Sequence, residues 1–150
     1  MSRFAEGIVA FERGDFNKAA ALFSAAITEG DRVALAFSKR GVCRLKWGDQ
    51  EEAEHDFRQA IAADDRCLSA MVNLANLMLE RGDLDAAQVY YDRALRIDET
   101  YAFAHYNLGV LHRKRGDLAA SIRELRLAAK YEAKPESAKK RLAFWKKKRI

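Results

Sequence analysis

Apolar residues recur along most of the chain at spacings of three and four, the period of an α-helix with one buried face. The run Phe16, Ala19, Ala20, Phe23 and Ala26 shows this pattern, and no stretch alternates strictly as a strand would. Short polar breaks divide the pattern into eight stretches. We therefore expect an all-α protein with first helices near 2–13, 35–47, 69–81 and 102–115, and second helices near 16–29, 50–63, 84–97 and 118–131.

The breaks between paired helices are themselves periodic. A Gly-Asp dipeptide stands at residues 14–15, 48–49, 82–83 and 116–117, a period of 34 residues. A fixed period of this length marks a repeat protein. Four further columns keep the same register: Gly7, Gly41, Ala75 and Gly109; Ala19, Ala53, Ala87 and Ser121; Phe23, Phe57, Tyr91 and Leu125; and Ala26, Ala60, Ala94 and Ala128.

Each column has a physical role. Glycine adopts the left-handed conformation that ends a helix at little cost. Aspartate then accepts hydrogen bonds from the unpaired amides that begin the next helix. Glu52, three residues after Asp49, adds a capping-box pattern in the second unit. The small residues allow the two helices of a hairpin to approach closely, and the bulky column fills the gap to the next unit.

Two of the units resemble tetratricopeptide repeats, on the residues Leu74, Ala75, Leu84, Ala87, Tyr91, Ala94 and Leu95 in the third and Tyr106-Asn107-Leu108-Gly109 in the fourth. The resemblance covers residues 2–134. It implies an α-solenoid of four helix-turn-helix repeats over residues 1–135. Pentatricopeptide repeats, which bind RNA, are one residue longer and would lose this register by residue 117.

The chain departs from the family pattern at two kinds of position. The usual proline between units is replaced by Asp31, Asp65, Glu99 and Ala133. Charged residues, namely Glu6, Arg40 and Arg44, also stand where apolar ones are usual. Because Glu6 and Arg40 are 34 residues apart, we expect them to be neighbours on adjacent first helices. There they either form an ion pair or both extend into solvent.

The last fifteen residues have their own composition. Residues 136–150 contain one Glu and seven cations: Lys139, Lys140, Arg141, Lys146, Lys147, Lys148 and Arg149. Pro135 suits a helix start, and Ala138, Leu142 and Trp145 lie along one stripe. Since the open end of a repeat array exposes apolar surface, we expect a basic C-terminal capping helix at 136–150. At the other end, Phe4, Ile8 and Phe11 are left to solvent or to a partner.

Nothing in the sequence predicts catalysis. His105 and His112 are seven residues apart on one expected helix, about 10.5 Å along its axis, too far to share one zinc ion. His105 falls in an apolar column, so we interpret it as a packing residue. His55, between Glu54 and Asp56, is assigned to a solvated face. We find no phosphate loop and no activated nucleophile, and expect a non-enzyme without metal or cofactor.

The cellular context is also constrained. Cys43 and Cys67 form no disulfide framework and are expected to be reduced packing residues, as in a reducing compartment. No apolar run is long enough for a membrane span, and the N-terminus has no basic region followed by a hydrophobic stretch. We therefore expect a cytoplasmic protein.

The resemblance implies that the first helices line a concave groove that binds a peptide or a partner segment. The expected groove residues are Phe4, Ile8, Lys39, Val42, Val72, Asn73, Asn76, Phe103, Tyr106, Asn107 and Val110. Asn73 and Asn107 are one repeat apart, so they would form a ladder. A carboxamide both donates and accepts, so it can pair with a peptide backbone of any sequence. The alternative is that these asparagines are polar residues on an exposed face.

The sequence leaves several partners open. Chaperone-docking relatives hold a terminal carboxylate with Lys, Asn and Arg from three first helices. The matching positions here carry Phe4, Ile8, Lys39, Ser69 and Asn73, or one repeat later Ser38, Val42, Asn73, Phe103 and Asn107. Neither set is a cationic clamp, which disfavours docking to acidic chaperone C-termini.

A protein-interaction adaptor is the leading hypothesis. In the second, the basic tail binds nucleic acid or an anionic membrane surface, against the interpretation that it is only a solubilising cap. A secretion-type chaperone ranks lower, because four repeats from Met1 leave no N-terminal dimerisation helix. A homo-oligomer, formed through the uncovered first repeat or the tail, is a further option.

Overall fold

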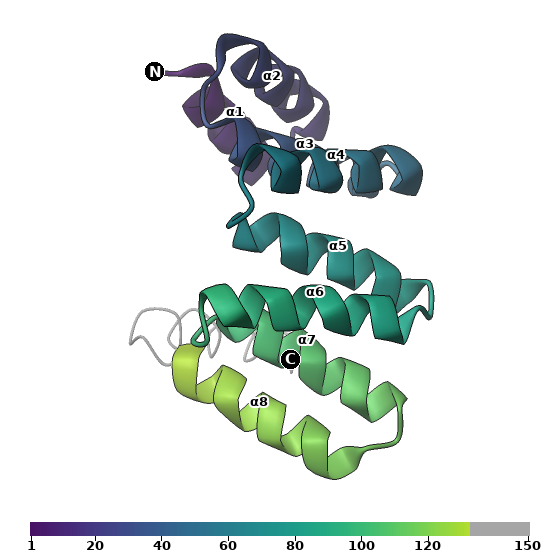
Figure 1. Ribbon diagram of the computed structural model, residues 1–150. Coiled ribbons are helices and arrows are strands. Elements are labelled where there is room, and N and C mark those ends of the chain that lie inside the picture. The colour runs from purple at the N-terminus through teal and green to yellow at the C-terminus, as the bar shows by residue number, and fades with distance from the viewer. Residues whose placement is uncertain (133–150) are drawn as a thin grey trace, which may run out of the picture. The chain divides into compact units, whose positions relative to one another are not determined.

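The computed structural model describes residues 1–132, and in this range it is helical without a strand (Figure 1). The helices are α1 (Arg3–Glu12), α2 (Phe16–Glu29), α3 (Val33–Lys46), α4 (Gln50–Ala63), α5 (Leu68–Glu80), α6 (Leu84–Ile97), α7 (Ala102–Lys114) and α8 (Leu118–Glu132). Each begins and ends within two residues of the expected position. The all-α, helix-turn-helix prediction is confirmed. The capping helix expected at 136–150 lies outside the described residues.

The chain divides into two compact units, residues 1–90 and 91–150, and the boundary falls within α6. In the first unit, α1 packs on α2, α2 on α3, α3 on α4 and α4 on α5. The first helices α3 and α5 also contact each other. In the described part of the second unit, α7 and α8 form a hairpin. Consecutive helices of the first unit are therefore antiparallel neighbours, as the short connections predict.

Each Gly-Asp turn ends one helix and begins the next. Gly14, Gly48, Gly82 and Gly116 all have a positive φ, between 79° and 82°. Each following aspartate caps its helix through Oδ1: Asp15 accepts from the amide of Lys18 at 3.2 Å, and Asp117 from that of Ala120 at 3.1 Å. Asp49 and Asp83 do the same. The turn chemistry predicted from the sequence is confirmed at all four sites.

The small column brings the hairpin helices close together. A Cβ added at Gly41 would lie 2.6 Å from a ring carbon of Phe57, and one at Gly109 would lie 2.8 Å from Leu125. The Ser121 hydroxyl donates to the Gly109 carbonyl at 2.7 Å, across the α7–α8 contact. In the first, second and fourth repeats, the bulky residue (Phe23, Phe57 or Leu125) thus lies on the backbone of the first helix of its own hairpin.

Candidate functional site

In the first unit, side chains of neighbouring first helices meet on the expected groove face. The hydroxyl groups of Ser38 on α3 and Ser69 on α5 are 3.1 Å apart. The carboxamide of Asn73, one turn further along α5, donates to the Ser38 hydroxyl at 3.4 Å. Asn73 therefore takes part in a polar contact between α3 and α5, and it is only partly buried.

Two lysines of α3 lie over aromatic rings of the first hairpin. The Lys39 ammonium is 5.1 Å from the ring centroid of Phe11, and the Lys46 ammonium is 5.6 Å from that of Phe16. A cation over a ring face is attracted by the ring quadrupole. Phe11 is packed edge-on against Phe16, at 5.4 Å between centroids. On this face, two ammonium groups therefore cover a pair of packed aromatic rings.

Two of the expected groove residues, Phe4 and Val72, are buried, and Phe4 packs on Phe23 at 5.8 Å between ring centroids. Their place in a groove stays a prediction. Neither offers a ligand more than a small edge. Four other expected groove residues are half-buried, so part of each side chain is accessible: Ile8, Lys39, Val42 and Asn76. Asn76 also takes part in an interaction within the protein.

In the second unit, α7 exposes two large aromatic side chains. Phe103 is 57% and Tyr106 is 48% exposed. Phe103 packs edge-on against Tyr101 at 5.7 Å. The Asn107 carboxamide donates to the Phe103 carbonyl of its own helix at 2.8 Å. Val110 is half-buried and lines, with Tyr106 and Arg113, a hollow of about 100 Å³ between α7 and α8.

The expected ladder takes one residue from each unit, Asn73 from the first and Asn107 from the second. The ladder stays a prediction. The seven cations of the tail, from Lys139 to Arg149, lie outside the described residues, and their role stays a prediction as well.

A second hollow, of about 360 Å³, lies on the first hairpin. It is lined by residues of α1, of α2 and of the turn between them, including Glu6, Val9, Arg13 and Lys18. The sequence predicts Ile8 and Phe11 at this end of the repeats but gives no expectation of a hollow. Its signal in the sequence is the small Ala10, at a position that carries Arg44 and Met78 in the next two repeats.

A charge network fills the second hairpin, and the sequence analysis missed it. Asp56 on α4 is fully buried and accepts from Arg40 of α3 through both oxygens, at 2.8 and 3.0 Å. Arg44 approaches the same carboxylate at 2.9 Å. Arg40 also donates to the Ser24 hydroxyl of α2 at 3.0 Å. The network therefore joins three consecutive helices.

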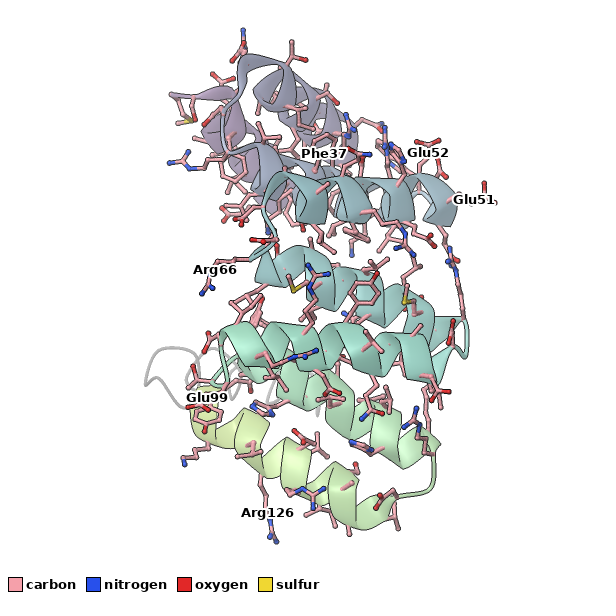
Figure 2. The ribbon with its side chains drawn as sticks, viewed as in Figure 1. Phe37, Glu51, Glu52, Arg66, Glu99 and Arg126 are labelled. Carbon is pink, nitrogen blue, oxygen red and sulfur yellow. The ribbon has the colours of Figure 1, made fainter. Side chains whose placement is uncertain are left out.

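This network corrects two expectations. Arg40 pairs with Asp56, and Glu6 pairs with Arg3 at 3.4 Å. The ion pair between Glu6 and Arg40 that their 34-residue spacing suggested is therefore not formed. Asp56 is not on a solvated face, although its neighbour His55 is exposed. In Figure 2, Glu51 and Glu52 extend from the start of α4.

His105 is a packing residue, as expected. It is 7% exposed, and its ring is stacked 5.6 Å from that of Tyr131. Nδ1 lies 2.7 Å from a carboxylate oxygen of Glu124, and Nε2 lies 2.7 Å from the carbonyl oxygen of Glu99. The ring thus ties the connection before α7 to α8. Among residues 1–132, no group of three or more His, Cys, Asp or Glu side chains is placed to hold a metal ion.

Burial and ion pairing shift the pKa values of two groups in the first unit, Cys43 and Glu54. Desolvation raises the pKa of the Cys43 thiol to about 11. The hydrogen bond from Arg81 lowers the pKa of Glu54, and Arg58 adds to this effect. Cys43 and Cys67 are both buried free thiols. A neutral, buried thiol is a poor nucleophile. We therefore interpret Cys43 as a packing residue and not as a reactive group.

Helical hairpins with a 34-residue period define an α-helical repeat protein. Residues 4–56 match the family described as tetratricopeptide repeat, and residues 75–116 match another described as TPR repeat. Together these segments make up more than half of the chain, and the chain belongs to the tetratricopeptide-repeat proteins. Repeats of this family mediate protein–protein interactions. Among curated protein sequences, none matches this chain.

Solved structures share the fold. A thermophilic tetratricopeptide-repeat protein of Thermus thermophilus has a TM-score of 0.77 at 23% identity, over 90% of this chain and 75% of that one. The protein MamA has a TM-score of 0.72 at 17% identity, over 89% and 78%. The first such domain of Spaghetti (RPAP3), bound to the HSP90 peptide SRMEEVD, has a TM-score of 0.68 at 16% identity, over 76% and 90%.

No helix within the described residues combines the length and the apolar character needed to cross a membrane.

Proposed function

We propose that this protein is a non-enzymatic adaptor that holds a segment of a partner protein on the face formed by its first helices. The observation that carries the proposal is the exposure of Phe103 and Tyr106 on α7. Exposed clustered aromatic side chains are typical of interaction sites, because they bury a large area on contact. The family supports the general activity, since its repeats bind proteins or peptides.

The chemistry of the face favours a partner segment with apolar anchors. Phe103 and Tyr106 would cover apolar side chains, and the Asn107 oxygen would accept from a backbone amide. In the first unit, the half-buried Ile8 and Val42 supply further apolar surface. Two buried, unreactive thiols fit the cytoplasm, and we propose that location for the protein.

The experiment compares alanine variants of exposed apolar side chains on two different helices. Phe103→Ala with Tyr106→Ala removes the aromatic pair of α7. Val89→Ala removes a 59% exposed side chain of α6 and serves as the control. All three side chains are exposed, so the unfolding midpoint should stay close to that of wild type.

We expect the α7 variant to lose capture of its partner from extracts of the native host and the α6 variant to keep it. Unchanged capture by a stably folded α7 variant would refute the proposal. The two alternatives, an anion-binding tail and a secretion-type chaperone, rest on the tail or on dimerisation, and neither requires Phe103 or Tyr106.

A further inference from the structure

His105 of the second unit lies between two oxygen atoms that accept hydrogen bonds. Nε2 is 2.7 Å from the carbonyl oxygen of Glu99, and Nδ1 is 2.7 Å from a carboxylate oxygen of Glu124. A carbonyl oxygen only accepts, so Nε2 carries a proton. The Nδ1 contact needs a second proton, because the lone pair of a neutral ring would face an ionised carboxylate. His105 and Glu124 together therefore hold one proton more than a neutral histidine and a carboxylate.

The surroundings of this pair limit its contact with water. His105 is buried, and its ring is stacked on that of Tyr131 near the end of α8. The side chain of Glu124 is 17% exposed. Burial alone favours a neutral ring, but a neutral ring cannot make both contacts, and Glu124 supplies the opposite charge at hydrogen-bond distance. The extra proton thus keeps the connection before α7 joined to α8.

Glu124 occupies the same repeat position as Asp56, which lies 68 residues earlier. In the second repeat, two arginines hold the Asp56 carboxylate. The fourth repeat carries Leu108 and His112 at the positions of these arginines. Arginine stays charged across the neutral pH range, whereas histidine gains and loses its proton there. The fourth repeat thus keeps the acidic residue but pairs it with a partner that titrates.

Other ionisable groups of the second unit lie near the pair. Tyr131 of α8 is stacked on the imidazole ring. Asp92 of α6 interacts electrostatically with Glu124, and also with Arg96 and His112. The negative charge of Asp92 beside Glu124 favours the extra proton, while the positive charge of Arg96 opposes it. Of these neighbours, His112 is the group that titrates in the same pH range as the pair, so it is the natural control.

We propose that His105 and Glu124 form a proton-dependent tie between α7 and α8, which is closed while the pair holds its extra proton and opens when that proton is lost to solvent. The neutral ring keeps the Nε2 proton, so the bond to Glu99 remains. The Nδ1 contact breaks, because a lone pair and a carboxylate repel each other. The folded pair holds a proton that an unfolded histidine releases above about pH 6.5, so stability falls as pH rises through the neutral range.

Glu124→Gln tests the extra proton with little change of shape. The glutamine amide can donate to Nδ1 of a neutral ring, so both contacts of His105 persist without the extra proton. In urea denaturation of the full chain between about pH 6 and pH 8, we expect the wild-type unfolding constant to rise by up to about tenfold per pH unit. The rise should be much smaller in Glu124→Gln. Equal pH dependence of the two proteins would overturn the proposal.

His112→Gln is the matched control, because it removes the other histidine near the pair and leaves both contacts of His105 in place. This variant should keep the pH dependence of the wild type. Loss of the dependence in His112→Gln would place the titrating proton on His112 and overturn the proposal. Cys43 is present in every variant, so its own effect on stability cancels in the comparison.

Nitrogen NMR of the histidine rings detects the proton in the wild-type protein, whether or not Glu124→Gln folds. In a pH titration we expect His105 to keep its extra proton to a higher pH than the exposed His55 does. A His105 ring that becomes neutral together with that of His55, or before it, would overturn the proposal.

Discussion

Asp56 is a buried carboxylate held by two arginines, Arg40 and Arg44. The same three columns carry Leu74, Met78 and Tyr90 in the third repeat. A buried ion pair recovers its desolvation cost only when every partner is in place. Bidentate contact from Arg40 and a third bond from Arg44 meet this condition. The network therefore acts as a polar substitute for an apolar contact between helices.

Removing the carboxylate charge should destabilise the protein strongly. Asp56→Asn leaves two arginines facing a neutral amide, and we expect a loss of about 3 kcal/mol in the free energy of unfolding, as for a broken buried pair. Glu51→Gln, on the exposed first turn of the same helix, is the control and should cost less than about 0.5 kcal/mol. Urea denaturation measures both. Equal midpoints for the two variants would contradict the account of the network.

The three charges should be replaceable together. Arg40→Leu, Arg44→Met and Asp56→Tyr reproduce the residues of the third repeat, and replacing a whole buried charge cluster by apolar residues is often neutral or stabilising. We expect the triple variant to unfold at a higher urea concentration than Asp56→Asn. A triple variant less stable than the single one would show that the charges have no apolar equivalent here.

Cys43 links stability to alkaline pH. Burial raises its pKa from 9.0 to about 11, so the folded thiol keeps its proton where the unfolded thiol has lost it. The native state then binds more protons than the unfolded state, and stability falls as pH rises above 9. We expect Cys43→Ala to remove part of this decline between pH 9 and 11. An identical pH dependence in the variant would contradict the assignment.

At the scale of the helix, the Gly-Asp turn and the small column define each hairpin. The glycine conformation, the aspartate cap and the bulky side chain on the opposite backbone are all local or connect residues 16 apart, such as Gly41 and Phe57. The glycine conformation and the aspartate cap occur at all four turns, which is why the sequence predicts every described helix to within two residues.

Gly41→Ala tests the close approach. Its Cβ would lie 2.6 Å from the fully buried ring of Phe57. Overpacking costs 1–3 kcal/mol and the gain in helix propensity is about 1 kcal/mol, so we expect a net loss of about 1 kcal/mol. Phe57→Leu in the same chain should make the added cost of alanine smaller.

Gly48→Ala is the matched control. It meets no atom within 4 Å but has φ +79°, so its cost is backbone strain that Phe57→Leu does not relieve. Thermal unfolding of the wild type, of Phe57→Leu, and of each alanine variant with and without Phe57→Leu separates the two causes. Equal coupling of both alanines to Phe57→Leu would argue against overpacking at Gly41.

At the scale of the molecule, the period predicts the fold better than it predicts the site. Columns 34 residues apart identify which positions are equivalent, but they do not say which face a charged residue takes. Arg40 contacts Asp56 across its own hairpin, at a spacing of 16, and Phe4 is drawn into the core by Phe23. In the third repeat, the positions equivalent to Arg40 and Asp56 carry Leu74 and Tyr90, also 16 residues apart. These large apolar and aromatic residues are the sequence signal that both positions face the inside of the hairpin.

The absence of a cationic clamp leads to a prediction about ligands. The neighbour Spaghetti (RPAP3) is bound to the HSP90 peptide SRMEEVD. Here Ser69 and Asn73 are bonded to Ser38, and Lys39 lies over a ring, so these positions supply no group of cations for the carboxylate of a peptide. We expect a Kd weaker than about 1 mM for this peptide by calorimetry. Binding of this peptide with a micromolar Kd would contradict the expectation that the protein does not dock on acidic chaperone C-termini.

The central claim is that the first helices hold the partner, and site-specific photocrosslinking in the native host tests it most directly. A photoreactive phenylalanine derivative replaces Asn73 or Asn107 on first helices, and Gln59 or Arg126 on exposed faces of second helices. We predict that the same partner is crosslinked from Asn73 and Asn107 and not from Gln59 or Arg126. A partner crosslinked from the second-helix positions alone would contradict the account.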